Sequence, residues 1–226
     1  MVILVTVAIP VWSGNLINNG SFTMPGGTTT NGYIDNGTQN MPGWTGGKSG
    51  ALDCYVVTNT NQFCGYATFA TNEGLSPNGG AYVMFDADPT YGSTLSQTVS
   101  GLIVGKFYKL SFYQAADHQS TFTGATNLSF SATLGTQKLT AASPNPTTVD
   151  AAWQFVYLIF TASATTETLT FSANGPTGGP PILLLDGVSL TQVPEPAEWT
   201  LVAIGGLLLF LGTKLKKRRP VTPTAD

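Results

Sequence analysis

The chain has 226 residues and a formal net charge of −3, and only 9% of its residues are Asp, Glu, Lys or Arg, whereas about 25% is usual in soluble proteins. Residues 15–193 hold four lysines against nine acidic residues. Nucleic-acid binding depends on Lys and Arg that neutralise phosphates, so this composition excludes a nucleic-acid-binding role. The 42% hydrophobic content allows one domain with a substantial core.

Residues 1–13 begin with the apolar run MVILVTVAIPV. This run is too short to cross a bilayer but has the length of the hydrophobic region of a secretory signal. Val11 and Ser13 suit the positions before a cleavage site, which would make Gly14 the first mature residue. Because the usual positive charges are missing, a truncated signal or a buried first strand are the alternatives. We expect residues 1–13 to be a signal peptide and residues 14–192 to be the exported domain.

Within the exported domain, apolar and polar residues alternate with a period of two, and Gly, Asn and Pro interrupt the alternation. No window shows the period of an amphipathic helix, so the pattern predicts an antiparallel β-sandwich. Trp153, Phe155 and Tyr157 share one face of a predicted strand, and we expect them in the core. Residues 23–50 are rich in Gly, Thr and Asn and are typical of a long loop that forms a site. The stretches with period two are 95–100, 108–113, 128–134, 153–159, 169–171 and 182–190.

Cys54 and Cys64 are the only cysteines. In an oxidising compartment two cysteines this close most simply form a disulfide, which stabilises the fold by about 2–3 kcal/mol. A metal site would need further ligands, and the chain has only one histidine. We therefore predict a Cys54–Cys64 disulfide.

Candidate catalytic groups are few. His118 follows Asp117, but no G-x-S-x-G pattern accompanies it, and we expect it on a surface loop beside a solvated carboxylate. Asp86 and Asp88 have the spacing of a pair on one strand face, yet Pro89 indicates a turn there, where they would decorate a loop or bind a cation. The sequence predicts a protein that is not an enzyme.

Residues 199–213 (WTLVAIGGLLLFLGT) are apolar and uncharged, and a basic cluster follows at 214–219. Fifteen residues reach about 22 Å as a helix, and snorkelling of Lys214 can make up the rest of a bilayer. Positive charge after such a segment favours a cytoplasmic tail, here 220–226, and places the domain outside. A buried core helix is the alternative, but it would rarely lack a polar face. We predict a single transmembrane helix.

The order Pro-Glu-Pro, apolar segment, basic cluster across residues 193–219 resembles the PEP-CTERM sorting signal of Gram-negative bacteria. The resemblance implies processing by an exosortase-type membrane transpeptidase. It further implies export, anchoring in the inner membrane with the domain outside the cytoplasm, and delivery to the cell surface or extracellular matrix. The sorting residues on this basis are Pro194, Glu195, Pro196, Lys216, Lys217, Arg218 and Arg219.

Four stretches in order resemble the galactose-binding-like fold of many carbohydrate-binding modules. Residues 15–22 look like its first strand, Pro42-Gly43-Trp44 like a motif that follows a loop, residues 95–115 like its central hairpin, and residues 185–190 like its closing strand. The resemblance implies a jelly-roll β-sandwich for the exported domain.

The same resemblance implies two sites. Members of the fold often hold a structural calcium, for which Asp186 fits one ligand position, but Thr23 stands where an acidic ligand is usual. Sugar binding needs aromatic side chains that stack on sugar rings. Trp44, in a Gly/Pro turn, and Tyr91 are the selected ligand-binding candidates, from a set that also includes Tyr55, Tyr113 and Trp153.

The favoured hypothesis is an exported, non-catalytic surface protein whose domain binds extracellular polysaccharide. The alternative is a structural matrix or adhesion protein without a defined sugar site, and a secreted hydrolase comes third. An exposed group of aromatic side chains on one face would favour the first, and a fully buried aromatic set the second. A cleft that holds His118 with a carboxylate would favour the third.

Overall fold

The computed structural model describes residues 14–24, 32–34, 41–47, 53–56, 62–63, 67–68, 76–79, 81–119, 126–148, 150–178 and 181–194, with only the backbone at 33, 53–56, 62–63 and 67–68. Gly14–Gln192 forms one compact unit, and the residues on either side of it form a second. Of the second unit, only Val193 and Pro194 are among the described residues.

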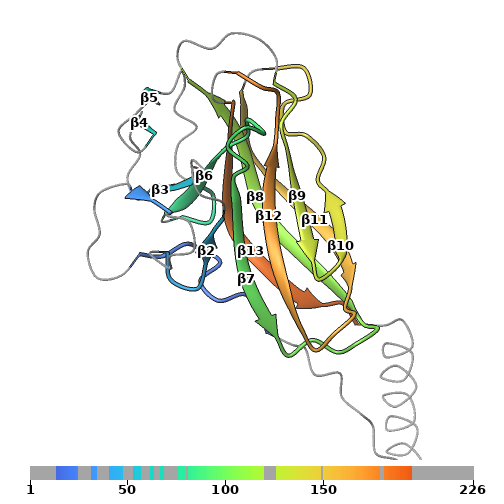
Figure 1. Cartoon of the computed structure of the whole chain (residues 1–226). Helices are drawn as coiled ribbons and strands as arrows, with labels where there is room; N and C mark the ends of the chain where they lie inside the picture. Colours follow the sequence, from blue (N-terminus) through green and yellow to red (C-terminus); the bar gives the residue numbers. More distant parts are fainter. Residues whose placement is uncertain are drawn as a thin grey trace, which may run out of the picture. The chain divides into compact units, whose positions relative to one another are not determined.

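The first unit is built from antiparallel sheets (Figure 1). The six-stranded sheet has, in spatial order, β1 (Gly32–Tyr33), β3 (Asp53–Val56), β6 (Tyr82–Asp86), β13 (Pro181–Gln192), β8 (Phe107–His118) and β11 (Ala151–Thr161). The five-stranded sheet has β10 (Gln137–Thr140), β9 (Ser129–Leu134), β12 (Thr166–Asn174), β7 (Thr94–Ser100) and β2 (Thr45–Gly46). A separate ribbon pairs β4 (Gln62–Phe63) with β5 (Ala67–Thr68). The predicted all-β sandwich is confirmed.

From β6 onward the chain alternates between the two sheets, apart from the β9–β10 hairpin within the five-stranded sheet, as in a jelly roll. This corrects the prediction of a central hairpin over residues 95–115. Its two halves are β7 and β8, which belong to different sheets, so the segment between them is a crossover. Gly101 and Gly105 have φ angles of +85° and +81° in that crossover. Their freedom to adopt positive φ lets the chain turn from one sheet to the other.

The core lies between the sheets and is rich in aromatic rings. Phe85 of β6 meets Phe130 of β9 with ring centroids 5.1 Å apart, and Phe112 of β8 meets Phe171 of β12 at 5.2 Å. Both pairs are edge-to-face, the arrangement that the charge distribution of aromatic rings favours. These contacts join the two sheets and explain why the apolar positions of these strands recur with period two.

The segment before the sheets lies alongside β13. Leu16 donates its backbone N–H to the carbonyl of Leu190 (2.9 Å), and Val188 donates to the carbonyl of Gly20 (2.9 Å). The prediction of a first strand at residues 15–22 is therefore wrong in form, because the segment makes these two bonds without becoming a strand. A Cβ at Gly20 would lie 1.9 Å from the Val188 oxygen, so a glycine is required there.

Several predictions concern residues outside the described ranges. These include the signal peptide at 1–13, the apolar segment at 199–213, the basic cluster at 214–219, the tail at 220–226, Glu195 and Pro196. Cys64 is also outside, and only the backbone of Cys54 is described, so the disulfide stays a prediction. Among the described residues, no helix has the length and apolarity to cross a bilayer.

Candidate functional site

Aromatic side chains project from the outer face of the six-stranded sheet where β8 and β11 pair. Phe155 and Tyr157 on β11 are 57% and 60% exposed. The strand register places Phe155 opposite Tyr113 of β8, and their rings meet at 5.3 Å. We call Tyr113, Phe155 and Tyr157 the aromatic face. The prediction that Phe155 and Tyr157 are buried is wrong.

The exposure follows from the composition of β11, which is apolar on both of its faces. Phe160 is fully buried, and Val156 and Leu158 pack against the same core. In a two-layer sandwich only one face of each strand meets the opposite sheet, so the side chains on the other face of β11 remain exposed to solvent. Trp153, at a register shift near the start of β11, is half-buried, and its ring lies 5.3 Å from that of Tyr82.

Hydroxyl groups border the aromatic face. On β8, Ser111 is opposite Tyr157, and on β13 Ser189 is opposite Ser111. One step along, Lys109 of β8 is opposite Thr191 of β13. Residues directly opposite each other in antiparallel strands point to the same side of the sheet. Ser111 is buried, whereas Ser189 and Thr191 are partly exposed and Lys109 is exposed. The surface therefore combines rings that can stack on the C–H faces of a sugar with a few polar groups that can bond its hydroxyls.

Asp186 of β13 lies directly opposite Tyr113, at the border of the aromatic face. Its side chain is fully buried, its Oδ1 accepts the Gly187 N–H (2.6 Å), and its Oδ2 has no hydrogen-bond partner among the described residues. Burial raises the pKa of Asp186 to about 6, against the opposing hydrogen bonds of Ser76 and Gly187.

The predicted calcium ligand set is incomplete among the described residues. Asp186 does not belong to a cluster of three or more His, Cys, Asp or Glu side chains there, whereas Ca²⁺ takes six to eight oxygen ligands. Thr23, at the other expected ligand position, donates its backbone N–H to Asn19 Oδ1 (2.7 Å). The calcium site therefore stays a hypothesis.

Trp44 is not on the surface, which corrects its selection as a ligand-binding residue. Its side chain is 0% exposed, its ring packs on Phe22 and Phe171, and its Nε1 donates to the carbonyl of Asn19 (3.0 Å). The Pro-Gly-Trp turn therefore delivers an indole to the core. The Trp44 indole thus packs in the core, and the sequence of a Gly/Pro turn alone does not distinguish that role from stacking on a ligand.

Tyr91, the other selected residue, is 39% exposed. It ends a turn in which its backbone N–H donates to the Asp88 carbonyl (3.1 Å). This turn follows β6, which pairs with the first half of β13. Tyr157 is opposite Ser111 of β8, and Ser111 is in turn opposite Ser189 in the second half of β13. Tyr91 and the aromatic face are therefore separate surfaces, and the role of Tyr91 stays a prediction.

His118 is the last residue of β8 and is 9% exposed, so its prediction as a surface-loop residue is wrong. Its Nδ1 lies 2.5 Å from Asp150 Oδ1 and 3.8 Å from Asp117 Oδ1. These three side chains have the ligand types of a metal site. Among the described residues, no serine or threonine hydroxyl is hydrogen-bonded to His118.

Asp86 and Asp88 shape the turn after β6. Asp86 Oδ1 accepts the Asp88 N–H (2.9 Å), while Asp88 accepts N–H groups from Thr90 (2.8 Å) and Gly178 (2.7 Å). Burial raises the pKa of Asp86 to about 6, whereas the bonds from Gly178 and Thr90 lower the pKa of Asp88. Both carboxylates are buried and accept backbone N–H groups, which agrees with the predicted turn.

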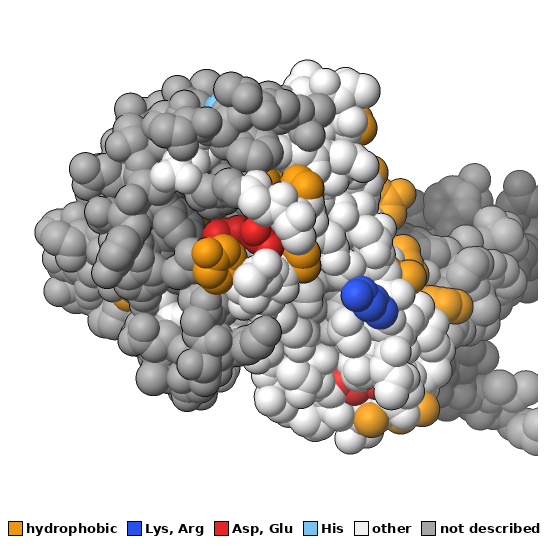
Figure 2. Space-filling model, turned by 45° about the horizontal axis from the view of Figure 1, so that its top comes forward, with side chains coloured by type: hydrophobic (Ala, Val, Ile, Leu, Met, Phe, Trp, Pro, Cys, Tyr) orange, Lys and Arg blue, Asp and Glu red, His pale blue; other side chains and the backbone are white. Residues whose placement is uncertain are grey.

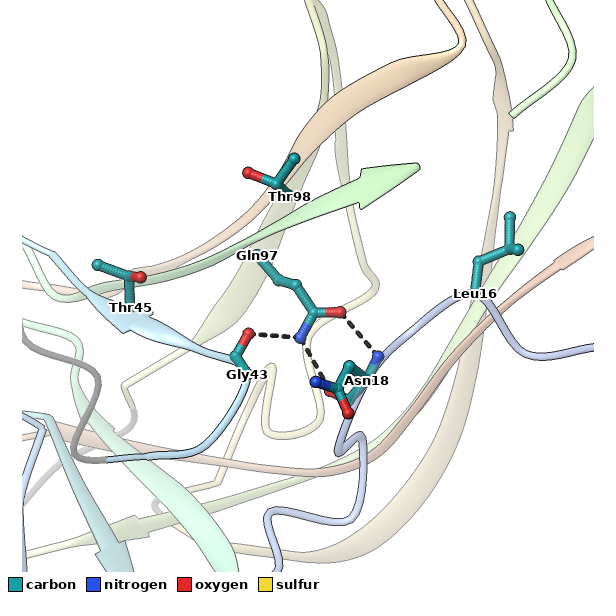
Figure 3. A pocket seen from close by; sticks show the side chains of 6 residues that line it. All are labelled: Leu16, Asn18, Gly43, Thr45, Gln97 and Thr98. Carbon is teal, nitrogen blue, oxygen red and sulfur yellow. Dashed lines mark hydrogen bonds between the residues drawn. The ribbon is translucent and has the colours of Figure 1, made fainter. Parts of the chain in front are cut away.

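A polar pocket of about 260 Å³ lies where β7 and β2 meet the N-terminal segment (Figure 3). Its centre is Gln97, whose Nε2 donates to the carbonyls of Asn18 (2.8 Å) and Gly43 (2.6 Å) and whose Oε1 accepts the Asn18 N–H (2.8 Å). All polar atoms of this amide are thus occupied by the chain itself. These hydrogen bonds connect β7 to the N-terminal segment and to the turn at Gly43, so a structural role explains the pocket better than ligand binding does.

No protein-family model matches this chain, and no curated protein matches it. Solved structures with a related fold include a Stig cyclase from Fischerella sp. TAU, in complex with (3Z)-3-(1-methyl-2-pyrrolidinylidene)-3H-indole. That likeness has 17% identity and a TM-score of 0.54 and covers 81% of this chain and 99% of the cyclase. The apo form of a Fischerella cyclase has 18% identity and a TM-score of 0.53, covering 81% and 97%. At such identities the likeness shows a shared fold alone.

Carbohydrate-binding modules are also among the similar structures. TmCBM61 in complex with β-1,4-galactotriose has 15% identity and a TM-score of 0.44, covering 80% of this chain and 100% of the module. A TM-score this low supports no inference about a ligand. The function of this chain must therefore be argued from its own surfaces.

Proposed function

We propose that the domain binds polysaccharide, without catalysis, through the aromatic face of β8 and β11. The observation that carries this proposal is the pair of exposed rings, Phe155 and Tyr157, beside Tyr113 and a border of hydroxyl groups. Large aromatic rings that stay exposed to water on a rigid strand lack the favourable free energy of apolar burial. A ligand stacked on them would bury this surface and so be stabilised. Figure 2 shows one face of the molecule, on which few charged side chains lie among neutral ones, and only 9% of all residues are charged. A protein with so few charges suits a neutral ligand such as a sugar chain.

The proposal also includes the cellular localisation of the protein. The Pro-Glu-Pro motif at 194–196, the apolar segment 199–213 and the basic cluster 214–219 would act as a sorting signal read by an exosortase-type transpeptidase. The domain would first be held at the inner membrane outside the cytoplasm and then reach the cell surface or matrix. In a host with that transpeptidase, replacing Glu195 with Ala should leave the chain in the membrane fraction. Unchanged release into the surface fraction would refute this part.

The binding test uses the full chain in mild detergent on a polysaccharide array. We expect saturable binding that weakens about five- to thirtyfold in Tyr157→Ala or Phe155→Ala, since losing an anchoring ring costs about 1–2 kcal/mol. Tyr91→Ala is the matched control, because it removes an exposed ring from another surface. Equal binding by all three variants would refute the aromatic face, and no binding by the folded parent would favour the matrix-protein alternative.

Calcium is a separate part of the proposal. If Asp186 Oδ2 binds Ca²⁺, the ion should raise the unfolding temperature at pH 7, and Asp186→Asn should abolish the effect. The same array run with calcium and with a chelator shows whether sugar binding depends on it. A melting curve that does not respond to calcium would leave Asp186 as a buried, readily protonated carboxyl group.

A further inference from the structure

The crossover between β7 and β8 presents apolar side chains to solvent. Ile103, Val104 and Phe107 are each about half exposed, and they lie within five consecutive residues. We call residues 103–107 the tip. Clustered exposed apolar side chains on a loop mark a surface that another apolar phase covers.

The tip is held firmly in this exposed arrangement. Leu102 donates its backbone N–H to Thr165 (3.1 Å), and Gly105 donates to Ala162 (2.8 Å). Inside the tip, Ile103 donates its N–H to the Tyr108 hydroxyl (2.9 Å). Because these bonds fix the loop against the β11–β12 connection, its apolar side chains cannot fold back onto the core.

The tip lies at the end of the sandwich from which the chain leaves toward its apolar segment. Gln192, the last residue of β13, is opposite Tyr108 at the start of β8. Trp199 follows seven residues later, a separation of about 24 Å when fully extended. An apolar segment at 199–213 must therefore begin within that distance of the base of the tip.

The charged side chains near the tip are lysines. Lys106 and Lys109 lie at or beside it, and Glu167 at the same end is buried, with its Oε1 accepting N–H groups of Ser163 and Ala164. At the opposite end, where β6 and β8 end and β11 begins, Asp86, Asp88 and Asp117 are buried and Asp150 is half-buried.

We infer that the tip inserts into the interfacial region of a bilayer that contains anionic lipid, and so holds the domain in one orientation on the membrane. The apolar tip would enter about 5–10 Å, with the neighbouring lysines near the headgroups. The carboxylates at the opposite end would then be directed away from the lipid. This inference rests on the proposed membrane segment for its location, but on the tip itself for its chemistry.

The experiment places an added indole at the tip in the full chain. Val104→Trp is compared with Thr90→Trp, an exposed position in the turn after β6, and with the parent, whose own tryptophans provide the common background. Each chain is mixed with phosphatidylcholine vesicles, with or without phosphatidylglycerol, that carry brominated acyl chains. We expect bromine to quench about half of the added Val104→Trp emission and none of the Thr90→Trp emission. In vesicles with phosphatidylglycerol, adding Lys109→Gln should reduce the quenching at position 104.

A carbonate wash of the same vesicles tests the membrane segment separately. A chain that resists the wash but shows equal quenching at 104 and 90 would overturn the tip inference and leave the membrane segment standing. Quenching at 104 in a chain that the wash removes would uphold the tip and refute the segment. Loss of both signals would refute both.

Discussion

At the scale of single residues, Gln97 shows how a polar side chain can hold an apolar framework together. Its position between Leu95 and Val99 marks it as inward-facing, and it is indeed 7% exposed. Its partners, Asn18 and Gly43, are 79 and 54 residues away in sequence. The strand pattern therefore predicts its direction, but its hydrogen bonds follow from tertiary structure that no local pattern contains.

Replacing Gln97 with Leu should lower the free energy of unfolding by about 2–4 kcal/mol, because two carbonyls and the Asn18 N–H would lose their partner in a part-buried joint. Thr98→Ala, at the exposed next position of β7, is the control and should cost less than about 0.5 kcal/mol. Urea unfolding of the three chains measures both effects. Equal stability of Gln97→Leu and the parent would contradict the structural role of the amide.

The buried carboxyl groups predict a dependence of stability on pH. The pKa of Asp86 and of Asp186 is raised to about 6 in the folded chain, so the folded state binds more protons than the unfolded state between about pH 4 and 6. Their contribution is therefore most favourable below about pH 4 and is lost as the pH rises through 6. In chelator, Asp186→Asn should be more stable relative to the parent at pH 7 than at pH 4.5, by about 2 kcal/mol.

Asp88→Asn provides a comparison of opposite sign, because hydrogen bonds from Gly178 and Thr90 lower the pKa of Asp88. It should destabilise the chain at pH 7 and less so as the pH falls below the ordinary aspartate range. Urea midpoints at several pH values separate the two behaviours. A pH-independent difference between Asp186→Asn and the parent would argue against the raised pKa.

At the scale of elements, β11 shows what strand patterns contain and what they omit. Its alternation predicts a strand correctly. However, the side chains on both faces of this strand are apolar, and hydrophobicity alone placed the exposed ones, Phe155 and Tyr157, in the core. Phe160 is inside and Tyr157 outside because only one face of an edge strand meets the second sheet. A strand that is apolar on both faces in a two-layer protein was the available signal of an exposed apolar surface.

The assignment of the two faces can be tested by two substitutions on this strand. Phe160→Ala should reduce the free energy of unfolding by about 3–5 kcal/mol, because it empties a buried ring position. Tyr157→Ala should change it by less than about 1 kcal/mol, since the exposed ring contacts little of the core. Thermal or urea unfolding decides the matter, and similar costs for both variants would place Tyr157 inside.

At the scale of the whole molecule, composition and alternation were enough to predict an all-β sandwich and six of its strands, which are β7, β8, β9, β11, β12 and β13. The crossover between β7 and β8 was mistaken for a hairpin. Two strands joined by a short glycine-containing segment have the same sequence pattern whether they pair with each other or belong to different sheets. The binding surface was mispredicted for a different reason. Trp44 and Phe155 have similar chemistry, and only the packing of the two sheets decides which of them reaches solvent.

The central claim is that polysaccharide covers the aromatic face, and hydroxyl-radical footprinting of the full chain tests it without any substitution. Exposed aromatic rings oxidise readily, so a bound polysaccharide should protect Phe155 and Tyr157 while Tyr91 and Ile103 react as in the free chain. Protection confined to those two β11 residues and the neighbouring Tyr113 is the predicted result. Protection centred on Tyr91, or unchanged oxidation of Phe155 and Tyr157 under saturating polysaccharide, would contradict it.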